Sequence, residues 1–219
     1  MKAAVVRRKI EWLETGTGRR LLVEESRRVR GALEGIFGDQ FVQIGQWRPR
    51  EYRTFSRTRR SAVVGDQIRE GVGLVSALDC LAIADDSVDV ALLPHVLETH
   101  DDPHGVLREV DRILRSDGHI VILGFNPVSW WGLRHFLSRR KFPNGIQRMI
   151  SEHRLRDWLR LLNFSVSHAS FQYFLSPIAG GYLLVARKEL FTVTPIKPAW
   201  KRPRRMVGRL VNPTTRNAA

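Results

Sequence analysis

Three histidines follow the most apolar stretch of the chain. His95, His100 and His104 come just after residues 88–93, a nearly continuous apolar run. Imidazole exchanges a proton near neutral pH and also binds metals, so such a group suits acid–base chemistry or a metal site. A metal site needs three or four converging ligands, and these positions converge only if their loop folds back on itself. We therefore predict no metal site, and solvated loop histidines are the alternative to a functional group.

A second group of candidate residues follows a second apolar run, at residues 120–123. Asn126 comes shortly after that run, and Trp130 and Trp131 follow. An aromatic pair beside a polar side chain is suited to line a hydrophobic substrate pocket. We predict that Asn126 and Trp130 contact a substrate, while an indole that faces the core is the alternative.

The two apolar runs belong to one β-α-β unit. Residues 88–93 and 120–123 have the composition of strands buried on both faces of a parallel sheet. Between them, Asp102 supplies a helix cap with Pro103 in the first turn, and apolar residues then recur at helical spacing as far as Leu114. A crossover of this kind is right-handed and places the fold in the α/β class.

The elements before this unit have weaker signals. Residues 19–36 have the spacing of an amphipathic helix, and residues 41–44 form a short strand candidate that ends at Gly45. Residues 46–60 hold six arginines and few apolar anchors, so we predict an exposed basic loop there. Short runs at 62–64 and 74–78 are further strand candidates.

Two helices and two strands are expected after the unit. Residues 130–137 and 152–162 have helical spacing, and residues 164–170 and 181–186 have the pattern of strands. Two strands without a helix between them predict an antiparallel hairpin at one edge of the sheet.

The domain organisation follows from length and composition. A chain of 219 residues is long enough for one core with appendages. Prolines and basic residues without apolar periodicity, from Thr194 onward, predict a disordered tail. We therefore expect an N-terminal segment (1–18), one folded domain (19–190) and a basic tail (191–219).

The formal net charge of +14 is unevenly distributed. Residues 61–130 carry 4 Lys/Arg against 12 Asp/Glu, whereas residues 131–219 carry 17 against 3. This pattern favours an anionic partner such as nucleic acid, bound through one arm from Arg48 to Arg60 and another from Lys197 to Arg209. Charge that serves only solubility is the alternative.

Cysteine content and hydropathy bear on location. The single cysteine, Cys80, cannot form an intramolecular disulfide, which is typical of a reducing compartment. Basic residues interrupt the apolar N-terminus, and no run approaches the ~18 apolar residues that a membrane span needs. We therefore expect a cytoplasmic protein without a signal peptide or transmembrane segment.

Three motifs in the middle of the chain occur together in one known family. They are LAIADDSVDV at 81–90, LE at 97–98 and LREVDRILRSDG at 107–118. They resemble the motifs LPFADxSFDxV, LEH and LxExxRVLKPGG of the type 11 methyltransferase domain, a class I S-adenosylmethionine-dependent methyltransferase family. The resemblance implies a three-layer, Rossmann-like α/β fold whose mostly parallel sheet has an antiparallel edge hairpin.

The resemblance also implies where the ligands lie. S-adenosylmethionine crosses the carboxyl ends of the parallel strands in this fold. His95 follows the strand where the family carries acceptor-side groups, and we predict that it is the general base. Glu98 matches the glutamate of the LE motif, for which structural capping is the alternative role. The predicted cofactor-binding residues are Gln43, Gly45, Gln46, Asp79, Leu93 and Pro94.

The glycine-rich loop of the family is altered in this chain. The family has an acidic residue and then three glycines at alternate positions, which here read Gln43, Gly45, Trp47 and Pro49. Glycines let the backbone lie against the cofactor because no side chain intrudes. If Trp47 closes this loop, we expect its indole to be buried in the cofactor's place.

Two other cofactor-binding features differ as well. Ala77 stands where the family has the aspartate that approaches adenine, and we expect no carboxylate at a strand end near residues 60–65. Two functions follow: methyl transfer to an undetermined acceptor, or a non-catalytic methyltransferase-like protein that binds a polyanion through its basic arms. A dinucleotide-dependent oxidoreductase ranks lower, because Gly-x-Gly-x-x-Gly is absent after the first strand.

Overall fold

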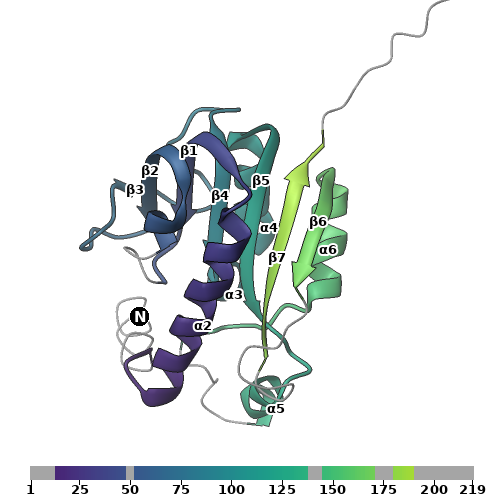
Figure 1. Cartoon of the computed structure of the whole chain (residues 1–219). Coiled ribbons are helices and arrows are strands. Elements are labelled where there is room, and N and C mark those ends of the chain that lie inside the picture. The colour runs from purple at the N-terminus through teal and green to yellow at the C-terminus, as the bar shows by residue number, and fades with distance from the viewer. Residues whose placement is uncertain (1–12, 48–51, 138–144, 171–179, 190–219) are drawn as a thin grey trace, which may run out of the picture.

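The computed structural model describes residues 13–47, 52–137, 145–170 and 180–189. Its strands are β1 (Phe37–Ile44), β2 (Arg57–Gly65), β3 (Leu74–Val75), β4 (Val88–Pro94), β5 (Leu114–Phe125), β6 (Phe164–Ser170) and β7 (Gly181–Lys188). They form one sheet in the order β3-β2-β1-β4-β5-β7-β6 (Figure 1). The first five strands in that order are parallel, and β7 and β6 add an antiparallel pair. The predicted α/β class and edge hairpin are confirmed.

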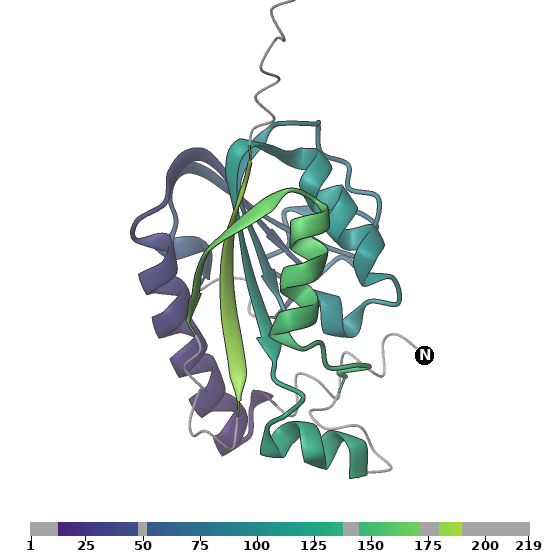
Figure 2. The ribbon, with the colours of Figure 1, turned by 90° about the vertical axis from the view of Figure 1, so that its right-hand side faces the viewer.

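Helices cover both faces of the sheet. They are α2 (Gly16–Leu33), the 3-10 turn η1 (Tyr52–Phe55), α3 (Val96–Thr99), α4 (Pro103–Ile113), α5 (Trp130–Leu137) and α6 (Glu152–Leu161). Helix α2 lies on one face, and α4 and α6 lie on the other, so the sheet is the middle of three layers (Figure 2). This arrangement explains the continuous apolar run of β4, because a strand covered on both faces exposes neither set of its side chains.

Two apolar cores fill the spaces between the layers. Leu93 and Val106 belong to the core under α4 and α6, whereas Leu92 and Leu21 belong to the core under α2. Successive residues of β4 thus point to opposite faces, as the pleat of a strand requires.

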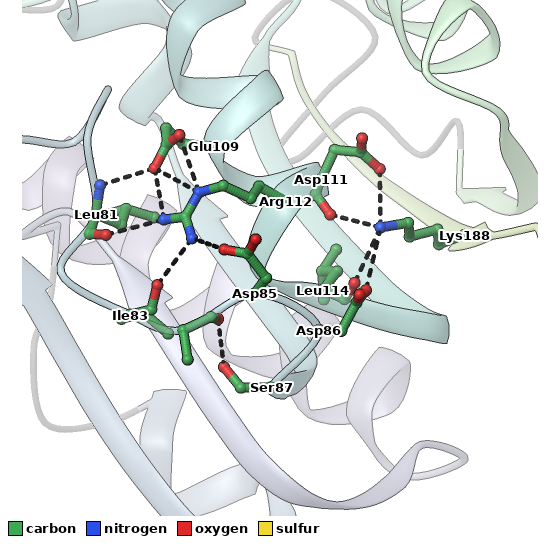
Figure 3. Close-up of polar contacts among 11 residues, drawn as sticks. Leu81, Ile83, Asp85, Asp86, Ser87, Glu109, Asp111, Arg112, Leu114 and Lys188 are labelled. Atoms are coloured by element: carbon green, nitrogen blue, oxygen red, sulfur yellow. Dashed lines mark hydrogen bonds and ion pairs between the residues drawn. The ribbon is translucent and has the colours of Figure 1, made fainter.

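Arg112 of α4 fastens the loop before β4 to the helix. Its guanidinium donates to the carbonyl oxygens of Leu81 (2.9 Å) and Ile83 (3.0 Å), and it pairs with Asp85 and Glu109 (Figure 3). Glu109 also accepts the N–H of Leu81 at 2.9 Å. The charged residues of two recognised motifs therefore hold this loop in place.

Lys188 joins the same corner to the edge hairpin. Its ammonium donates to the carbonyl oxygens of Asp111 (2.6 Å) and Leu114 (3.0 Å). It also lies 3.8 Å from the carboxylate of Asp86 (Figure 3). The last strand is therefore tied to the junction of α4 and β5.

The first helix begins earlier and ends earlier than the expected span of residues 19–36. Thr15 caps α2, since its hydroxyl accepts the N–H of Gly18 at 3.2 Å, and the helix ends at Leu33. A capped first turn explains why the helix starts three residues before the first arginine pair.

The prediction of an exposed basic loop over residues 46–60 is wrong. Trp47 and Tyr52 are buried, and β2 already begins at Arg57. Backbone pairing with β1 makes this a strand despite its polar side chains, which is a tertiary effect that propensity does not capture. The arginines occupy the exposed part of the strand, where the guanidinium of Arg57 lies 5.4 Å from the ring centre of Phe37.

Several predictions concern residues outside the described ranges. Arg48 and Pro49 lie there, as do residues 1–12 and 190–219, which include the predicted tail and its basic arm. The proposed domain boundaries remain predictions. Within the described residues, no helix combines the length and apolar character of a membrane span.

Candidate functional site

The carboxyl ends of the parallel strands meet at one edge of the sheet. Strands β1 and β4 are neighbours, although β2 and β3 come between them in the chain, so the strand order reverses at this point. Ligands of open α/β sheets bind in the crevice outside such a switch point. Gly45 follows β1, Asp66 follows β2 and His95 follows β4, so all three lie along this edge.

Gly45 makes the turn at the end of β1. Its φ is +85°, and its N–H donates to the carbonyl oxygen of Val64 at 2.8 Å. A Cβ at this position would lie 2.4 Å from Cγ2 of Val96. Glycine is therefore required here both by backbone conformation and by space.

Gln43 lies two residues before this turn, on the side of the sheet that faces α2. Phe41 and Leu92, which have the same orientation in their strands, belong to the α2 core. Gln43 is fully buried, and its Nε2 donates to the carbonyl oxygen of Gly45 at 3.1 Å. Its Oε1 has no hydrogen-bond partner among the described residues. A buried oxygen of this kind is a candidate acceptor for a ligand or an ordered water.

Trp47 is buried beside the turn, as a closed loop requires. Its exposed fraction is 5%, and its ring centre lies 4.2 Å from that of His95. The ring of His95 stacks on Phe125 at 4.2 Å. Three rings therefore lie together at the ends of β1, β4 and β5, and we call Trp47, His95 and Phe125 the ring stack.

The carboxylate of Glu25 reaches the ring stack from α2. One oxygen accepts the indole N–H of Trp47 at 2.8 Å and the hydroxyl of Tyr52 at 3.0 Å. The other lies 2.7 Å from Nε2 of His95. Glu25 and His95 have no exposed surface. A carboxylate buried this completely needs hydrogen-bonding partners on both oxygens, and these three side chains supply them.

His95 is held in a strained backbone conformation. Its φ is 55°, in the left-handed region, at the junction of β4 and α3. Its Nδ1 lies 2.8 Å from Glu98, whose second oxygen accepts the N–H of Phe125 at 2.6 Å. Such strain costs about 1–3 kcal/mol and persists where the surroundings require it. Here the two carboxylates that flank the imidazole supply that requirement.

The electrostatics of this cluster favour a charged imidazole. Burial alone lowers the pKa of His95, but Glu25 and Glu98 outweigh burial and raise the pKa to about 9. Burial raises the pKa of Glu98, against the opposing effect of His95. At neutral pH both ring nitrogens of His95 are therefore donors. A general base needs a free ring nitrogen, so His95 in this arrangement links two carboxylates instead.

Asp66 corrects the expectation that no carboxylate follows a strand near residues 60–65. Strand β2 extends to Gly65, so the exposed Asp66 is the first residue beyond it. It follows the Gly45 turn by about 20 residues, the spacing at which nucleotide-binding sheets place the carboxylate for ribose hydroxyls. The expectation was wrong because the apolar run at 62–64 does not reveal where the strand ends.

The other predicted cofactor residues are spread along the sheet edge. Leu93 and Pro94 are buried at the last two positions of β4. Gln46 lies next to the end of β2, since a Cβ on Gly65 would be 3.0 Å from its Nε2. Asp79 is exposed and lies against the first turn of α4. Asp79 thus belongs to the α4 side of the sheet, away from the ring stack.

The predicted substrate residues lie where β5 continues into α5. The carbonyl and side-chain oxygens of Asn126 accept hydrogen bonds from the turn that follows. Trp130 is the first residue of α5, and Trp131 is buried with its ring centre 5.6 Å from Phe125. Trp131 therefore faces the core, and Asn126 shapes the turn at the sheet edge.

The three histidines are not brought together. His95 is buried in the ring stack, whereas His100 lies 3.2 Å from the N–H of Asp102, and His104 packs on Trp158 with ring centres 3.9 Å apart. In the part of the chain that the structure describes, no three His, Cys, Asp or Glu side chains are arranged to hold a metal ion.

Glu25, Tyr52 and Phe125 were not predicted as site residues. Glu25 had a readable signal, since Leu22, Glu25 and Val29 recur at helical spacing and all three are buried. A carboxylate on the apolar face of a helix needs a buried partner. Tyr52 has no comparable signal, because it lies among arginines.

Comparison with known proteins bears on the central part of the sheet. A family model described as a methyltransferase domain matches residues 58–122, from β2 into β5. Over this segment the chain is similar to methyltransferase domains. S-adenosylmethionine is the cofactor that this domain implies.

One curated relative matches part of the chain. Uncharacterized protein YafS of Escherichia coli K12 is 43% identical over 141 residues, which are 57% of this chain and 59% of YafS. The chain thus matches less than two thirds of that relative's length.

Two solved methyltransferases resemble the domain at low sequence identity. A Thermotoga maritima protein, described as a possible histamine N-methyltransferase, has a TM-score of 0.66 and 20% identity over 78% of this chain and 90% of its own. Burkholderia thailandensis 1,6-didemethyltoxoflavin-N1-methyltransferase, solved with S-adenosylhomocysteine, has a TM-score of 0.60 and 21% identity over 86% and 89%. At these identities the likeness shows the fold alone.

The sheet edge fits one half of S-adenosylmethionine. The Gly45 turn permits close approach, Asp66 follows β2, and Gln43 presents a buried oxygen without a partner among the described residues. On the α2 side of the sheet, where Gln43 also lies, Trp47 and Glu25 fill the space beside His95. The glycine turn and Asp66 are suited to a nucleoside, whereas the buried indole occupies the space beside His95.

Proposed function

We propose that the methyltransferase domain binds S-adenosylmethionine along its carboxyl edge and transfers the methyl group to an acceptor of undetermined identity. The observation that carries this proposal is the pairing of a positive-φ glycine turn after β1 with a carboxylate after β2, at the switch point of the sheet. When bound, the cofactor supplies an electrophilic methyl group.

Residues of the chain divide the binding task in this proposal. Asp66 accepts hydrogen bonds from the ribose hydroxyls, Gly45 lets the backbone approach the ligand, and Gln43 offers an acceptor oxygen on the α2 side. Gln46, Leu93 and the other predicted cofactor residues line the same edge or its α4 side.

His95 remains the proposed acceptor-side base of this reaction. Its position after β4 supports the proposal, whereas its hydrogen bonds constrain it. It can remove a proton only after Glu25 or Glu98 releases a ring nitrogen and the imidazole becomes neutral. Asn126 and Trp130, at the start of α5, are the proposed contacts to the acceptor.

Isothermal titration calorimetry tests the binding step directly. We expect heat on addition of S-adenosylmethionine or S-adenosylhomocysteine to the full chain, and less heat with Asp66→Ala. Asp39→Ala is the matched control, because that carboxylate is also exposed but lies near the amino end of β1, at the opposite edge of the sheet. Protein near millimolar concentration detects affinities as weak as about −4 kcal/mol. If neither ligand gives heat at that protein concentration, the result contradicts the catalytic proposal.

A second candidate function is non-catalytic binding of a polyanion, and exposed arginines on β2 and α2 favour it. Arg57, Arg59 and Arg60 are exposed on β2, and Arg19, Arg20, Arg27 and Arg30 are exposed on α2. Guanidinium groups bind phosphate oxygens without regard to sequence. In this alternative the domain retains the methyltransferase fold and not its chemistry.

A further inference from the structure

Trp47 occupies the part of the sheet edge that decides which adenosyl compounds can enter. We infer that its indole, held by Glu25, makes the site selective for nucleosides that lack an amino-acid chain, and that S-adenosylmethionine enters only when the indole moves. This inference rests on the proposed binding of the cofactor at this edge.

Two of its contacts show where the indole lies. Its N–H donates to Glu25 at 2.8 Å, and its ring lies against His95 with centres 4.2 Å apart. One contact comes from α2 and the other from the end of β4, so the indole bridges the switch point between β1 and β4. Only 5% of the surface of Trp47 is exposed, so its side chain fills this space and does not line an open crevice.

The expected direction of the ligand places its chain at this point. In nucleotide-binding sheets the ribose lies by the carboxylate after the second strand, and the group on the ribose 5′ carbon lies over the glycine turn of the first strand. Asp66 and Gly45 occupy those two positions here. In S-adenosylmethionine that 5′ group carries the amino-acid chain, so the chain is directed at the residues just after Gly45, where Trp47 lies.

The charge of the cluster adds to the steric effect. Glu25 presents a carboxyl group to this space from α2, with both oxygens already hydrogen-bonded by Trp47, Tyr52 and His95. The amino-acid chain is a zwitterion: its carboxylate is repelled by Glu25, and its ammonium group meets carboxylate oxygens that already accept hydrogen bonds. A methyl group on the 5′ sulfur, in contrast, carries no charge and needs little room.

A pair of ligands that differ only in the amino-acid chain tests the inference. S-adenosylhomocysteine and 5′-methylthioadenosine share adenosine and a thioether sulfur. With the full chain we expect 5′-methylthioadenosine to bind at least as tightly as S-adenosylhomocysteine. In the unsubstituted chain, S-adenosylhomocysteine must break the hydrogen bond from Trp47 to Glu25 before it can bind. Trp47→Gly removes this cost, so we expect S-adenosylhomocysteine to bind the variant roughly tenfold tighter or more. Binding of 5′-methylthioadenosine should change by less than about threefold.

Trp158→Gly is the matched control for loss of an indole. Trp158 is partly buried on the opposite face of the sheet, where it packs on His104. The variant should leave the affinity ratio of the two ligands unchanged. An equal gain for S-adenosylhomocysteine in both glycine variants overturns the inference, because the gain would then reflect general loosening.

A measurement on the unmutated side chain keeps the inference testable if Trp47→Gly does not fold. In protein labelled with 5-fluorotryptophan, the resonance lost in Trp47→Phe identifies position 47. S-adenosylhomocysteine should move this resonance, and 5′-methylthioadenosine should leave it near its starting position. Movement with neither ligand, although both bind, overturns the inference.

The two levels of proposal fail in different ways. If S-adenosylhomocysteine binds the full chain and Trp47→Gly equally well, the indole does not select, and the proposed function stands. If neither ligand binds any folded variant, both the proposed function and the inference that rests on it are wrong.

Discussion

The carboxylate of Glu25 is buried away from water, and hydrogen bonds from neighbouring side chains reach both of its oxygens. Glu25 accepts from Trp47, Tyr52 and His95, and His95 is also held by Glu98. Inside a protein, removal of one member of such a network leaves the others desolvated and unpaired. Single substitutions within this cluster should therefore lower the free energy of unfolding strongly.

Glu25→Ala should destabilise the protein strongly. The change leaves an imidazolium, an indole N–H and a phenol without their common acceptor, and loss of one partner of a buried pair costs roughly 3–5 kcal/mol. Urea unfolding measures the free energy of unfolding. The control is the adjacent Glu24→Ala, which removes surface ion pairs to Arg27 and Arg28 at a cost of about 1 kcal/mol or less. Similar losses for both variants would show that the cluster is not a special source of stability.

The pKa of His95 predicts a loss of stability as pH rises from about 7 to 9. The folded state holds the proton with a pKa of about 9, against 6.5 for an ordinary histidine, so folding is favoured below that range and the benefit disappears through pH 9. A shift of this size corresponds to roughly 3 kcal/mol. The raised pKa of Glu98 acts in the same direction at lower pH, whereas His119, with a lowered pKa, acts oppositely near pH 6.

Thermal unfolding between pH 7 and 9 measures this dependence. We expect the melting temperature to fall across the window in the unsubstituted chain. The fall should become smaller in Glu25→Gln, because the neutral amide no longer raises the pKa of His95. If the melting temperature falls by the same amount between pH 7 and 9 in both proteins, the pH dependence arises from other groups.

At the scale of elements, the β-α-β unit is held by contacts between α4 and the loop that precedes β4. Asp102 caps α4 through the N–H of Gly105 at 2.9 Å, and Arg112 near the other end of the helix gathers the loop (Figure 3). The charged side chains of the recognised motifs therefore stabilise the junction between α4 and the loop before β4.

Arg112→Ala should loosen the loop before β4 without changing the sheet. The variant removes donors to two carbonyl oxygens and two carboxylates, and we expect a loss of roughly 1–2 kcal/mol because the guanidinium is partly exposed to solvent. Hydrogen exchange should accelerate at the amide of Leu81, whose partner Glu109 loses its own support. Arg108→Ala is the control, since that side chain is 66% exposed and lies 3.7 Å from Asp102. Unchanged exchange at Leu81 would refute the role of Arg112.

At the scale of the whole molecule, charge is segregated along the chain. The acidic segment 61–130 forms β4, α4 and the loop fastened by Arg112, whereas exposed arginines lie on α2 and β2. Exposed arginines attract polyanions because their binding releases the counterions of the phosphates. The predicted basic tail, which lies outside the described residues, carries further positive charge.

Deletion of residues 195–219 should weaken binding to heparin and DNA. It removes seven Lys/Arg, so both the affinity and the slope of its logarithm against salt concentration should decrease. Arg57→Gln with Arg59→Gln should have a smaller effect of the same kind, and Arg108→Gln, in the acidic segment, should have none. Equal affinity and equal salt slope for the full and shortened chains would exclude the tail as a contact surface.

The sequence by itself determined the α/β class, the β-α-β unit and the edge hairpin. These depend on signals within a few residues of one another: the apolar run of β4, the cap at Asp102 and the helical spacing that follows it. It also identified the glycine turn and the position of Trp47, because motif spacing is a property of the chain alone.

Only the tertiary structure decided what those positions do. The arginine-rich segment at 57–60 became a strand because β1 pairs with it, and this in turn placed Asp66 at the ligand edge. Glu25 and His95 are 70 positions apart, and no local pattern joins them. Their contact depends on how α2 crosses the sheet, which is set by packing of whole faces, so the state of the histidine and the closure of the turn by Trp47 could be read only from the folded molecule.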